Sequence, residues 1–395
     1  MARTANLSAA KAAKNDEFYT QWADIEREMN AYLEYDSDVF RDKVVLCPCD
    51  DPEWSNFAKF FALHFTDFGL KKLISTSYAP DSKPAPPEPT LFEMEDPKFD
   101  AEKTHSNGKV FVLERDDVNG DGVVNIENLR WDYLEGDGDF RSSEVTALRD
   151  EADIIVTNPP FSLFREFVRW LTVGNKRFSI IGNQNAITYS QIFPLIKENR
   201  LWKGATANNT DMVFGVPKGA TVKEADRAKA ARMGYPSDER HDYTRLGNSC
   251  WFTNLEHGRR HQPMELMSTA DNLRFNKKLI KSLEGSAAYR QYDNFDAIEV
   301  PYSDAIPSDF NGVMGVPISF LDRFNPEQFE IVDLSRYAKT RGMSKEFVDA
   351  YYKSGQTGQI SEGHPDLCYY NNAGRPVVPY MRVLIRHRNS ATKEG

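Results

Sequence analysis

The sequence lacks the marks of membrane proteins and of disulfide-rich secreted proteins. No apolar run approaches the roughly 18 residues that a membrane span requires. The four cysteines among 395 residues are too few for a disulfide framework. No continuous apolar segment follows the early positive charges, so we expect no secretory signal. These absences favour a soluble globular protein in a reducing cytoplasm, with about two domains at roughly 100 to 200 residues each.

Positive charge is also scarce. Lys and Arg total 49 against 59 Asp and Glu, and the net charge of -10 argues against nonspecific coating of nucleic acid. Contact with nucleic acid must then come from local clusters. The candidate phosphate contacts are Arg227, Lys229, Arg232, Arg240, Arg245, Arg259, Arg260, Arg274, Lys277, Lys278, Lys281, Arg382, Arg386 and Arg388. The alternative for each is an ordinary solvated position.

Short β-branched runs and amphipathic segments alternate over the first part of the chain. We expect strands at 43–47, 71–78, 109–113, 152–157, 177–182, 212–217 and 248–255, and helices at 16–35, 56–68 and 162–171. This order predicts an α/β fold. The proline-rich segment 80–97 reads as a surface excursion, and the charged stretch 218–240 as a mobile one. Because the alternation is lost near residue 257, we place a domain boundary there, before a mainly irregular or β-containing region.

The strongest local signal is Asn158-Pro159-Pro160-Phe161, directly after a buried strand and before a helix. Ligands of open α/β sheets bind at that edge. The two prolines make the turn rigid and remove N–H groups, so it presents acceptors. If the Asn158 side-chain oxygen and the Pro159 carbonyl each accept one hydrogen of an exocyclic amine, the nitrogen lone pair is released from the ring and can attack an electrophile. Phe161 then offers a stacking face; the plainer interpretation is a strand end and a core ring.

A glycine-rich turn, GDGDF at 136–140, precedes the strand that leads to Asn158. A carboxylate at Asp139 and an aromatic ring at Phe140 suit the amino edge and the face of a cofactor adenine. Alone, this pentapeptide would more often be an ordinary surface turn.

Taken together, these segments resemble the adenine-specific DNA methyltransferases of the EcoRI type, which use S-adenosylmethionine. The similar segments are NDEFYTQ (15–21), VVLCPCDDPEWSNF (44–57), GDGDFRS (136–142), TNPPFSLFREF (157–167), GNQNA (182–186), FGVP (214–217), GNSCWFTNL (247–255) and GVMGVPISFLDRFNPEQFEIV (312–332). They follow the family's order and span most of the chain. NPPF alone also occurs in RNA and protein-glutamine methyltransferases, whereas its combination with CPCDDP is much more specific.

The resemblance implies transfer of a methyl group from S-adenosylmethionine to the N6 of an adenine flipped out of duplex DNA. It implies a doubly wound, Rossmann-like methyltransferase domain at 1–256 and a target (DNA) recognition region at 257–395, in which the Gly-, Tyr- and Asn-rich stretch 340–375 suits base readout. A cognate restriction endonuclease acting separately is an implied partner. Asn158, Pro159, Pro160 and Phe161 match the family's catalytic motif. The implied cofactor-binding residues are Phe18, Tyr19, Thr20, Cys47, Pro48, Cys49, Asp50, Asp139 and Phe140.

The first turn departs from the usual pattern, because it lacks the G-x-G by which most such enzymes let the cofactor approach the backbone. The second strand, ending ISTSY, also lacks the acidic residue that would hold the ribose hydroxyls. The ribose contact stays open between Asp50, Asp51 and Ser75.

Other signals compete with this reading. The segment Asp117–Asn125 matches the start of a calcium loop, D-x-N-x-D-G, but its twelfth position is Asn128 and no second loop pairs with it. Cys47 and Cys49 form a poor zinc ligand set, and the scattered histidines form no catalytic triad. The alternatives to a DNA methyltransferase are therefore an RNA base methyltransferase and a calcium-loop binding module.

Overall fold

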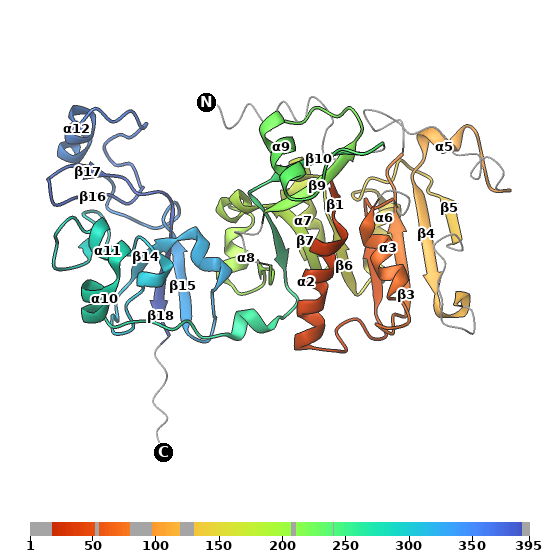
Figure 1. The fold of residues 1–395 in the computed structure, drawn as a ribbon, viewed down its shortest axis with the longest axis horizontal. Helices are drawn as coiled ribbons and strands as arrows, with labels where there is room; N and C mark the ends of the chain where they lie inside the picture. The colour runs from red at the N-terminus through yellow and green to blue at the C-terminus, as the bar shows by residue number, and fades with distance from the viewer. Residues whose placement is uncertain are drawn as a thin grey trace, which may run out of the picture. The chain divides into compact units, whose positions relative to one another are not determined.

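The computed structural model describes residues 18–51, 55–79, 97–118, 130–206, 211–239 and 241–388 (Figure 1). Most of the proline-rich segment and of the calcium-type loop lies outside these ranges. The chain forms two compact units, one of residues 1–192 and 201–258 and one of residues 193–200 and 259–395. None of the helices in the described ranges has the length and apolar character needed to cross a membrane.

The first unit is built on an eight-stranded sheet. Its strands, in spatial order, are β5 (Arg130–Tyr133), β4 (Lys109–Glu114), β3 (Lys72–Thr76), β2 (Val44–Cys47), β6 (Ile154–Thr157), β7 (Arg177–Asn183), β11 (Ser249–Thr253) and β8 (Trp202–Lys203). β3, β2, β6 and β7 are parallel, and the outer strands add antiparallel on both sides. The expected α/β class is confirmed, as are the strands expected in the first unit.

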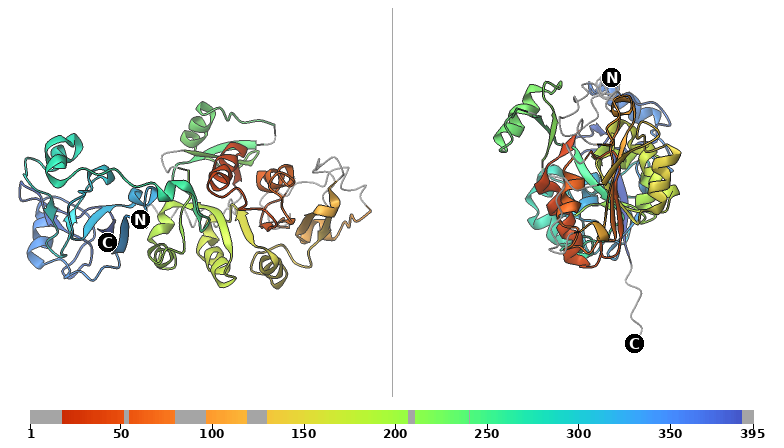
Figure 2. Two further views of the ribbon diagram at one scale, coloured as in Figure 1. Left: turned by 90° about the horizontal axis from the view of Figure 1, so that it is seen from below. Right: turned by 90° about the vertical axis from the view of Figure 1, so that its right-hand side faces the viewer.

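Helices cover both faces of this sheet. Figure 2 shows α2 (Trp22–Tyr35) and α3 (Asn56–Leu63) on one face, and α6 (Ser143–Glu151) and α7 (Phe164–Val173) on the other. Every residue of β2 and β6 is buried, as expected for parallel strands covered on both sides. Ser55 and Ser142 cap α3 and α6, each accepting a hydrogen bond from a backbone N–H of the first turn. The short helix α5 (Lys103–Ser106) precedes β4.

The core of the first unit is rich in aromatic rings. Phe57 of α3 packs edge-on against Trp251 of β11, with ring centroids 5.9 Å apart. Ile25, Met29 and Tyr32 lie on one side of the amphipathic helix α2 and are fully buried. Helix α2 is therefore fixed to the sheet along one face.

A small antiparallel sheet joins distant parts of the first unit. It consists of β1 (Tyr19–Thr20), β9 (Met212–Pro217) and β10 (His241–Leu246). Within the stretch 218–240, for which the sequence predicted mobility and no regular element, the structure has helix α9 (Glu224–Arg232). The alanines of α9 favour a helix. Because Ala230 is its buried residue, the helix has no broad apolar face, and its sequence shows no hydrophobic periodicity.

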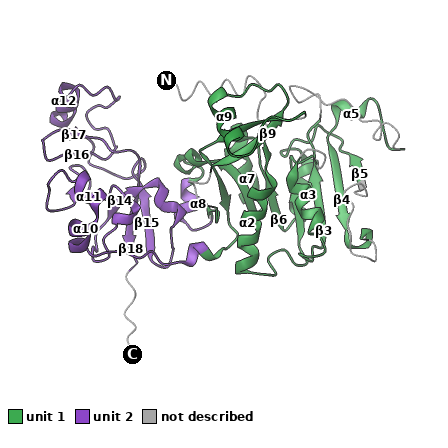
Figure 3. Cartoon of the chain, viewed as in Figure 1, with its two compact units in different colours: residues 1–192, 201–258 green, residues 193–200, 259–395 purple. Residues whose placement is uncertain are grey.

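The second unit, purple in Figure 3, is more regular than expected. Its five-stranded sheet has the order β12 (Arg290–Gln291), β13 (Ile298–Glu299), β14 (Met314–Pro317), β18 (Arg382–His387) and β15 (Phe329–Leu334). It also holds the helices α8 (Phe193–Lys197), α10 (Thr269–Phe275), α11 (Lys277–Ser282) and α12 (Lys345–Lys353), and the strand pair β16 (Tyr369–Tyr370) and β17 (Pro376–Val377). Strands and helices as short as these produce only a weak hydrophobic periodicity in the sequence, which is why the sequence predicted a mainly irregular or β-containing region.

A buried ion pair holds this second sheet together. The guanidinium of Arg382 donates to the Glu299 carboxylate at 2.6 Å, and the Tyr292 hydroxyl donates to the same group. Burial, then the charge of Glu299, raises the pKa of the Tyr292 hydroxyl well above its usual value. The cluster fixes β18 to β13 through side chains.

Candidate active site

The candidate site lies where β2 and β6 end. Their parallel register pairs Val45 with Ile154, so the turns that follow the two strands start at the same edge of the sheet. The hydroxyl of Thr157, the last residue of β6, lies 2.5 Å from the carbonyl oxygen of Pro48 in the first turn. The structure thus brings together the CPCDD turn and the NPPF turn.

Asn158 is held by a residue far away in the sequence. Its side-chain Nδ2 donates to the carbonyl oxygen of Phe18 at 2.7 Å. Its Oδ1 is buried and has no hydrogen-bond partner among the described residues. A buried acceptor without a partner is costly. The fixed amide therefore presents an oxygen that a ligand donor can satisfy.

Two aromatic rings lie beside this amide. The rings of Phe18 and Phe161 are stacked, with centroids 5.5 Å apart and planes 27° apart. Phe214 meets the Phe18 ring edge-on at 5.9 Å. Pairing of Thr20 with Phe214, between β1 and β9, brings Phe18 to this place. The structure thus brings Phe18 together with Asn158 and Phe161.

A cavity of about 500 Å³ opens beside Phe18 and Phe161. Most of the residues that line it have polar side chains, among them Ser162, Asn183, Asn185, Tyr189, Asn248 and Ser249. Its size lies in the range of ordinary ligand pockets. Asn183, Asn185, Asn248 and Ser249 belong to the GNQNA and GNSCWFTNL segments, which the sequence marked only as segments. Their gathering depends on the β7–β11 pairing of Asn183 with Ser249.

The first turn compensates for its missing glycines. Cys49 has a φ of 64°, the left-handed region that glycine adopts most easily. Its backbone N–H donates to the hydroxyl of Thr76 at 3.3 Å. Cys47, in contrast, is fully buried, and burial, then the nearby Asp50, raises the pKa of its thiol well above the usual value. The side chain of Cys47 is therefore a core group, and only the backbone there can meet a cofactor.

Two of the three candidates for the ribose contact are engaged inside the protein. Asp50 is only 4% exposed, and its carboxyl is hydrogen-bonded to the hydroxyls of Ser55 and Thr157. The Ser75 hydroxyl is buried as well and donates to the Asp50 carbonyl. Asp51 is the one candidate of the three that is not buried.

The GDGDF turn differs from its expected use. Phe140 is 2% exposed, and its ring packs against Phe167 and Trp170, so it offers no open stacking face. Its backbone N–H has no acceptor among the described residues. The Asp139 carboxylate accepts from Arg141, and although burial raises its pKa, these hydrogen bonds outweigh burial and hold the pKa below the usual value. A cofactor amine at Asp139 would therefore compete with Arg141.

Several of the proposed phosphate contacts are engaged elsewhere. Arg382 belongs to the buried ion pair described above, and Arg245 pairs with Asp211. Arg260 is 4% exposed and donates to a neighbouring amide. The sequence showed the charge of these three residues but not their partners within the protein. Lys229, Arg232, Lys277 and Lys281 are among the candidates that stay predictions, and Arg240 lies outside the described residues.

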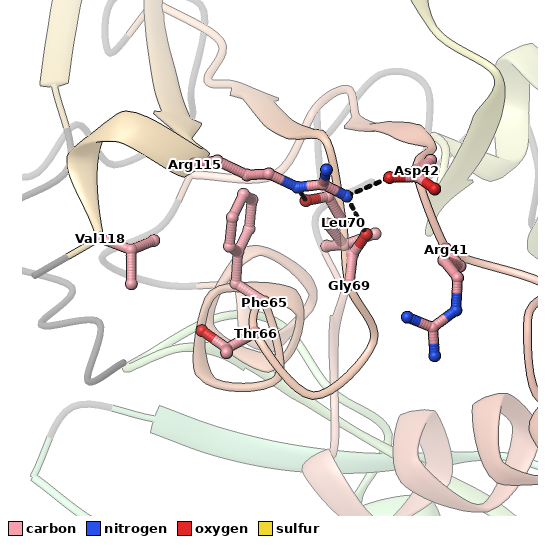
Figure 4. Close-up of a pocket in the computed structure, with 8 residues that line it drawn as sticks. All are labelled: Arg41, Asp42, Phe65, Thr66, Gly69, Leu70, Arg115 and Val118. Carbon is pink, nitrogen blue, oxygen red and sulfur yellow. Dashed lines mark hydrogen bonds and ion pairs between the residues drawn. The ribbon is translucent and has the colours of Figure 1, made fainter. Parts of the chain in front are cut away.

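Figure 4 shows a second cavity, of about 480 Å³, near Arg115. The Arg115 guanidinium donates to the carbonyls of Leu70 and Gly69 at 2.9 and 2.7 Å, and also to Asp42. Asp42 precedes β2 and Leu70 precedes β3, so the cavity lies at the amino ends of the parallel strands. Ligands of such sheets bind at the opposite, carboxyl ends.

Within the described ranges, no three His, Cys, Asp or Glu side chains gather as a metal site. Most of the calcium-type loop at 117–125 is outside those ranges, so its expected chemistry stays a prediction.

Known proteins with similar sequences belong to one family. The family model described as "Adenine-specific methyltransferase EcoRI" matches residues 6–388. The chain is 40% identical over 348 residues to the type II methyltransferase M.EcoRI of Escherichia coli, covering 87% of this chain and 94% of that protein. It is 34% identical over 385 residues to the type II methyltransferase M.MpnI of Mycoplasma pneumoniae, covering 97% and 98%. No solved structure matches the chain.

Proposed function

Because the chain belongs to the family of EcoRI-type adenine-specific methyltransferases, we propose that its Asn158–Phe161 turn is where methyl transfer to adenine takes place. The protein is an S-adenosylmethionine-dependent DNA methyltransferase of type II. The first unit is its doubly wound, Rossmann-like catalytic domain, with the reaction at the carboxyl ends of β2 and β6. The target is the exocyclic N6 of an adenine that leaves the stacked duplex to reach the turn.

The residues at this edge suit the cofactor. S-adenosylmethionine supplies an electrophilic methyl group when it is bound. The Thr20 hydroxyl is buried without a partner among the described residues, next to Phe18, and fits the polar end of the methionine part. The backbone of Pro48 and Cys49, the N–H of Phe140 and the Asp51 carboxylate are the remaining contacts that we assign. The side chains of Cys47, Asp50 and Phe140 have a structural role in this assignment.

Asn158 orients the target amine by accepting a hydrogen bond from it. Its Oδ1 accepts one hydrogen of the target amine, and the Pro159 carbonyl accepts the other. The lone pair of the amine nitrogen is thereby directed out of the base plane, toward the electrophile. Positioning of this kind accounts for much of the catalysis, because attack on a sulfonium methyl group needs no strong base. The buried, unpartnered Oδ1 is the observation that carries this proposal.

Phe161 and the polar cavity receive the flipped base. A base that stacks on Phe161 takes the place of the Phe18 ring, which lies on Phe161 in this structure. Base–aromatic stacking contributes roughly 1 to 3 kcal/mol. The cavity residues Asn183 and Asn248 can then bond to the ring nitrogens of the base or to its sugar.

The second unit is the proposed region of DNA recognition. It carries exposed aromatic side chains, among them Tyr380, which is 88% exposed, and Tyr302. Its basic candidates on α11, Lys277 and Lys281, suit phosphate contacts. Replacing both lysines should weaken binding to all duplexes alike and lower its salt dependence.

The test combines activity with binding. Asn158→Ala should lower the rate of methyl transfer by about 10² to 10³, the usual loss when one preorganised hydrogen bond of a transition state is removed, while cofactor affinity stays within about threefold. Asn30→Ala, on the exposed face of α2, is the matched control. Wild-type activity in Asn158→Ala would refute the assigned role.

The product identifies the substrate. After incubation with methyl-labelled cofactor and duplex DNA or RNA, digestion to nucleosides should yield labelled N6-methyldeoxyadenosine. Label in RNA alone would favour the RNA base methyltransferase instead.

A further inference from the structure

A buried carboxyl joins the cofactor turn to the catalytic turn. Asp50 follows β2, and its Oδ2 lies 2.5 Å from the hydroxyl of Thr157, the residue before Asn158. Its Oδ1 accepts the hydroxyl hydrogen of Ser55, the N-cap of α3, at 2.6 Å. The Asp50 N–H donates to the Thr76 carbonyl at 2.7 Å. Asp50 thus touches β3, β6 and α3 at the floor of the site.

The hydrogens at this cluster can be counted. The Thr157 oxygen lies 2.5 Å from both the Pro48 carbonyl and the Asp50 Oδ2. A threonine hydroxyl has one hydrogen, and a carbonyl has none to give. If Asp50 is a carboxylate, the one hydroxyl hydrogen of Thr157 must serve two acceptor oxygens at once, and at least one pair of oxygens meets without a well-aligned proton. A proton on Oδ2 completes the set, since Asp50 then donates to Thr157, and Thr157 donates to Pro48.

We propose that Asp50 works as a neutral carboxylic acid, a positioning residue whose proton ties the CPCDD turn to Thr157 and so sets the place of Asn158. Burial, the first cause, raises the pKa of Asp50 to about 7, while the hydrogen bond that its carboxyl accepts from Ser55 lowers it in part. The titratable groups that face it are Cys47, whose pKa is itself raised, and Asp51, whose charge raises the Asp50 pKa further. Ser75, Thr76 and Ser55 on the neighbouring elements carry no charge at neutral pH.

This role rests on the proposed function of Asn158. When Asp50 loses its proton above neutral pH, it can no longer donate to Thr157. The Oδ2 of Asp50 and the hydroxyl oxygen of Thr157 then repel each other. The strand end that carries Asn158 must then shift. The rate of methyl transfer should therefore decline as pH rises through about 7. Ionisation of Asp50 causes this decline, and no catalytic base takes part in it.

The direct test is the titration of the carboxyl carbon. In protein labelled with ¹³C at the aspartate carboxyl, the signal that is lost in Asp50→Asn should titrate near pH 7, whereas an ordinary aspartate titrates near 4. A midpoint below about 5 would overturn the proposal. This result does not depend on activity, so it stands or fails separately from the role of Asn158.

The second test uses substitutions that separate the proton from the charge. The amide introduced by Asp50→Asn can donate to Thr157 and accept from Ser55, so this variant should keep most methyl transfer and lose the decline at high pH. Asp50→Ala and Thr157→Val should lower the rate at least tenfold with cofactor affinity retained, and Thr157→Ser should restore it. Equal loss in Asp50→Asn and Asp50→Ala would show that the charge is needed, and would refute the neutral acid.

Discussion

The ionisation of Asp50 should dominate one part of the pH dependence of stability. The group is 4% exposed, and its pKa in the folded protein is raised to about 7 by burial. In the unfolded chain its pKa is about 4. Between these values the folded state keeps a proton that the unfolded state has lost. The free energy of unfolding therefore falls as pH rises from about 4 to about 7.

The magnitude follows from the width of this interval. About three pH units at 1.36 kcal/mol each give roughly 4 kcal/mol of stability that is present below pH 4 and lost by pH 7. Asp50→Asn has no proton to exchange and should lack this slope. Relative to the wild type, the variant should gain about 4 kcal/mol across the interval.

Urea unfolding of both proteins at a series of pH values measures this difference, through the transition midpoint and its slope. The pKa values of Asp139 and Asp242 lie below the usual value, so these groups give the opposite slope in acid. They are present in both proteins and cancel in the difference. Parallel curves for the variant and the wild type would mean that Asp50 is ionised when folded, which contradicts the hydrogen count.

Substitutions at three further positions test the structural assignments. Glu28→Ala should lower the free energy of unfolding, measured by urea denaturation, by about 3 kcal/mol or more. The side chain of Glu28 is fully buried and accepts hydrogen bonds from the N–H groups of Ala205 and Thr206, each at 2.8 Å. Glu28→Gln should lower it less. Arg382→Met should destabilise the second unit by about 3 to 5 kcal/mol, measured by hydrogen exchange, because it leaves Glu299 buried and unpaired. Phe140→Ala should lower stability by about 3 to 5 kcal/mol in thermal unfolding, and a loss of cofactor affinity with unchanged stability would contradict its place in the core.

The sequence singled out the Asn158–Phe161 turn because several local signals coincide there. A β-branched run such as 154–157 favours a central parallel strand, and two prolines end it at once. Parallel pairing then brings its carboxyl end beside that of β2, whatever the rest of the fold. The place of Asn158 relative to the CPCDD turn follows from these rules.

Residues placed by tertiary contacts could not be predicted in this way. Phe18 reaches Asn158 because β1 pairs with β9, nearly two hundred residues later, and neither short strand has a period of its own. Phe140 looks like an exposed ring on a glycine turn, yet it packs beneath α7. A single aromatic residue does not reveal which side of a turn it occupies, so the residue types of the turn suggested an open ring at Phe140 that the packing does not provide, and only the resemblance linked Phe18 to a cofactor.

The first turn shows why an absent motif does not exclude a function. Glycine is common in such turns because it adopts a positive φ without strain. Here Cys49 adopts that conformation, and its N–H is held by the Thr76 hydroxyl. The surrounding bonds through Asp50 and Thr157 hold the turn in place, which a flexible glycine loop does not require. Cys49 and Asp50 therefore stabilise this turn together, and replacing Cys49 by glycine should also loosen the Asn158 turn that Asp50 contacts through Thr157.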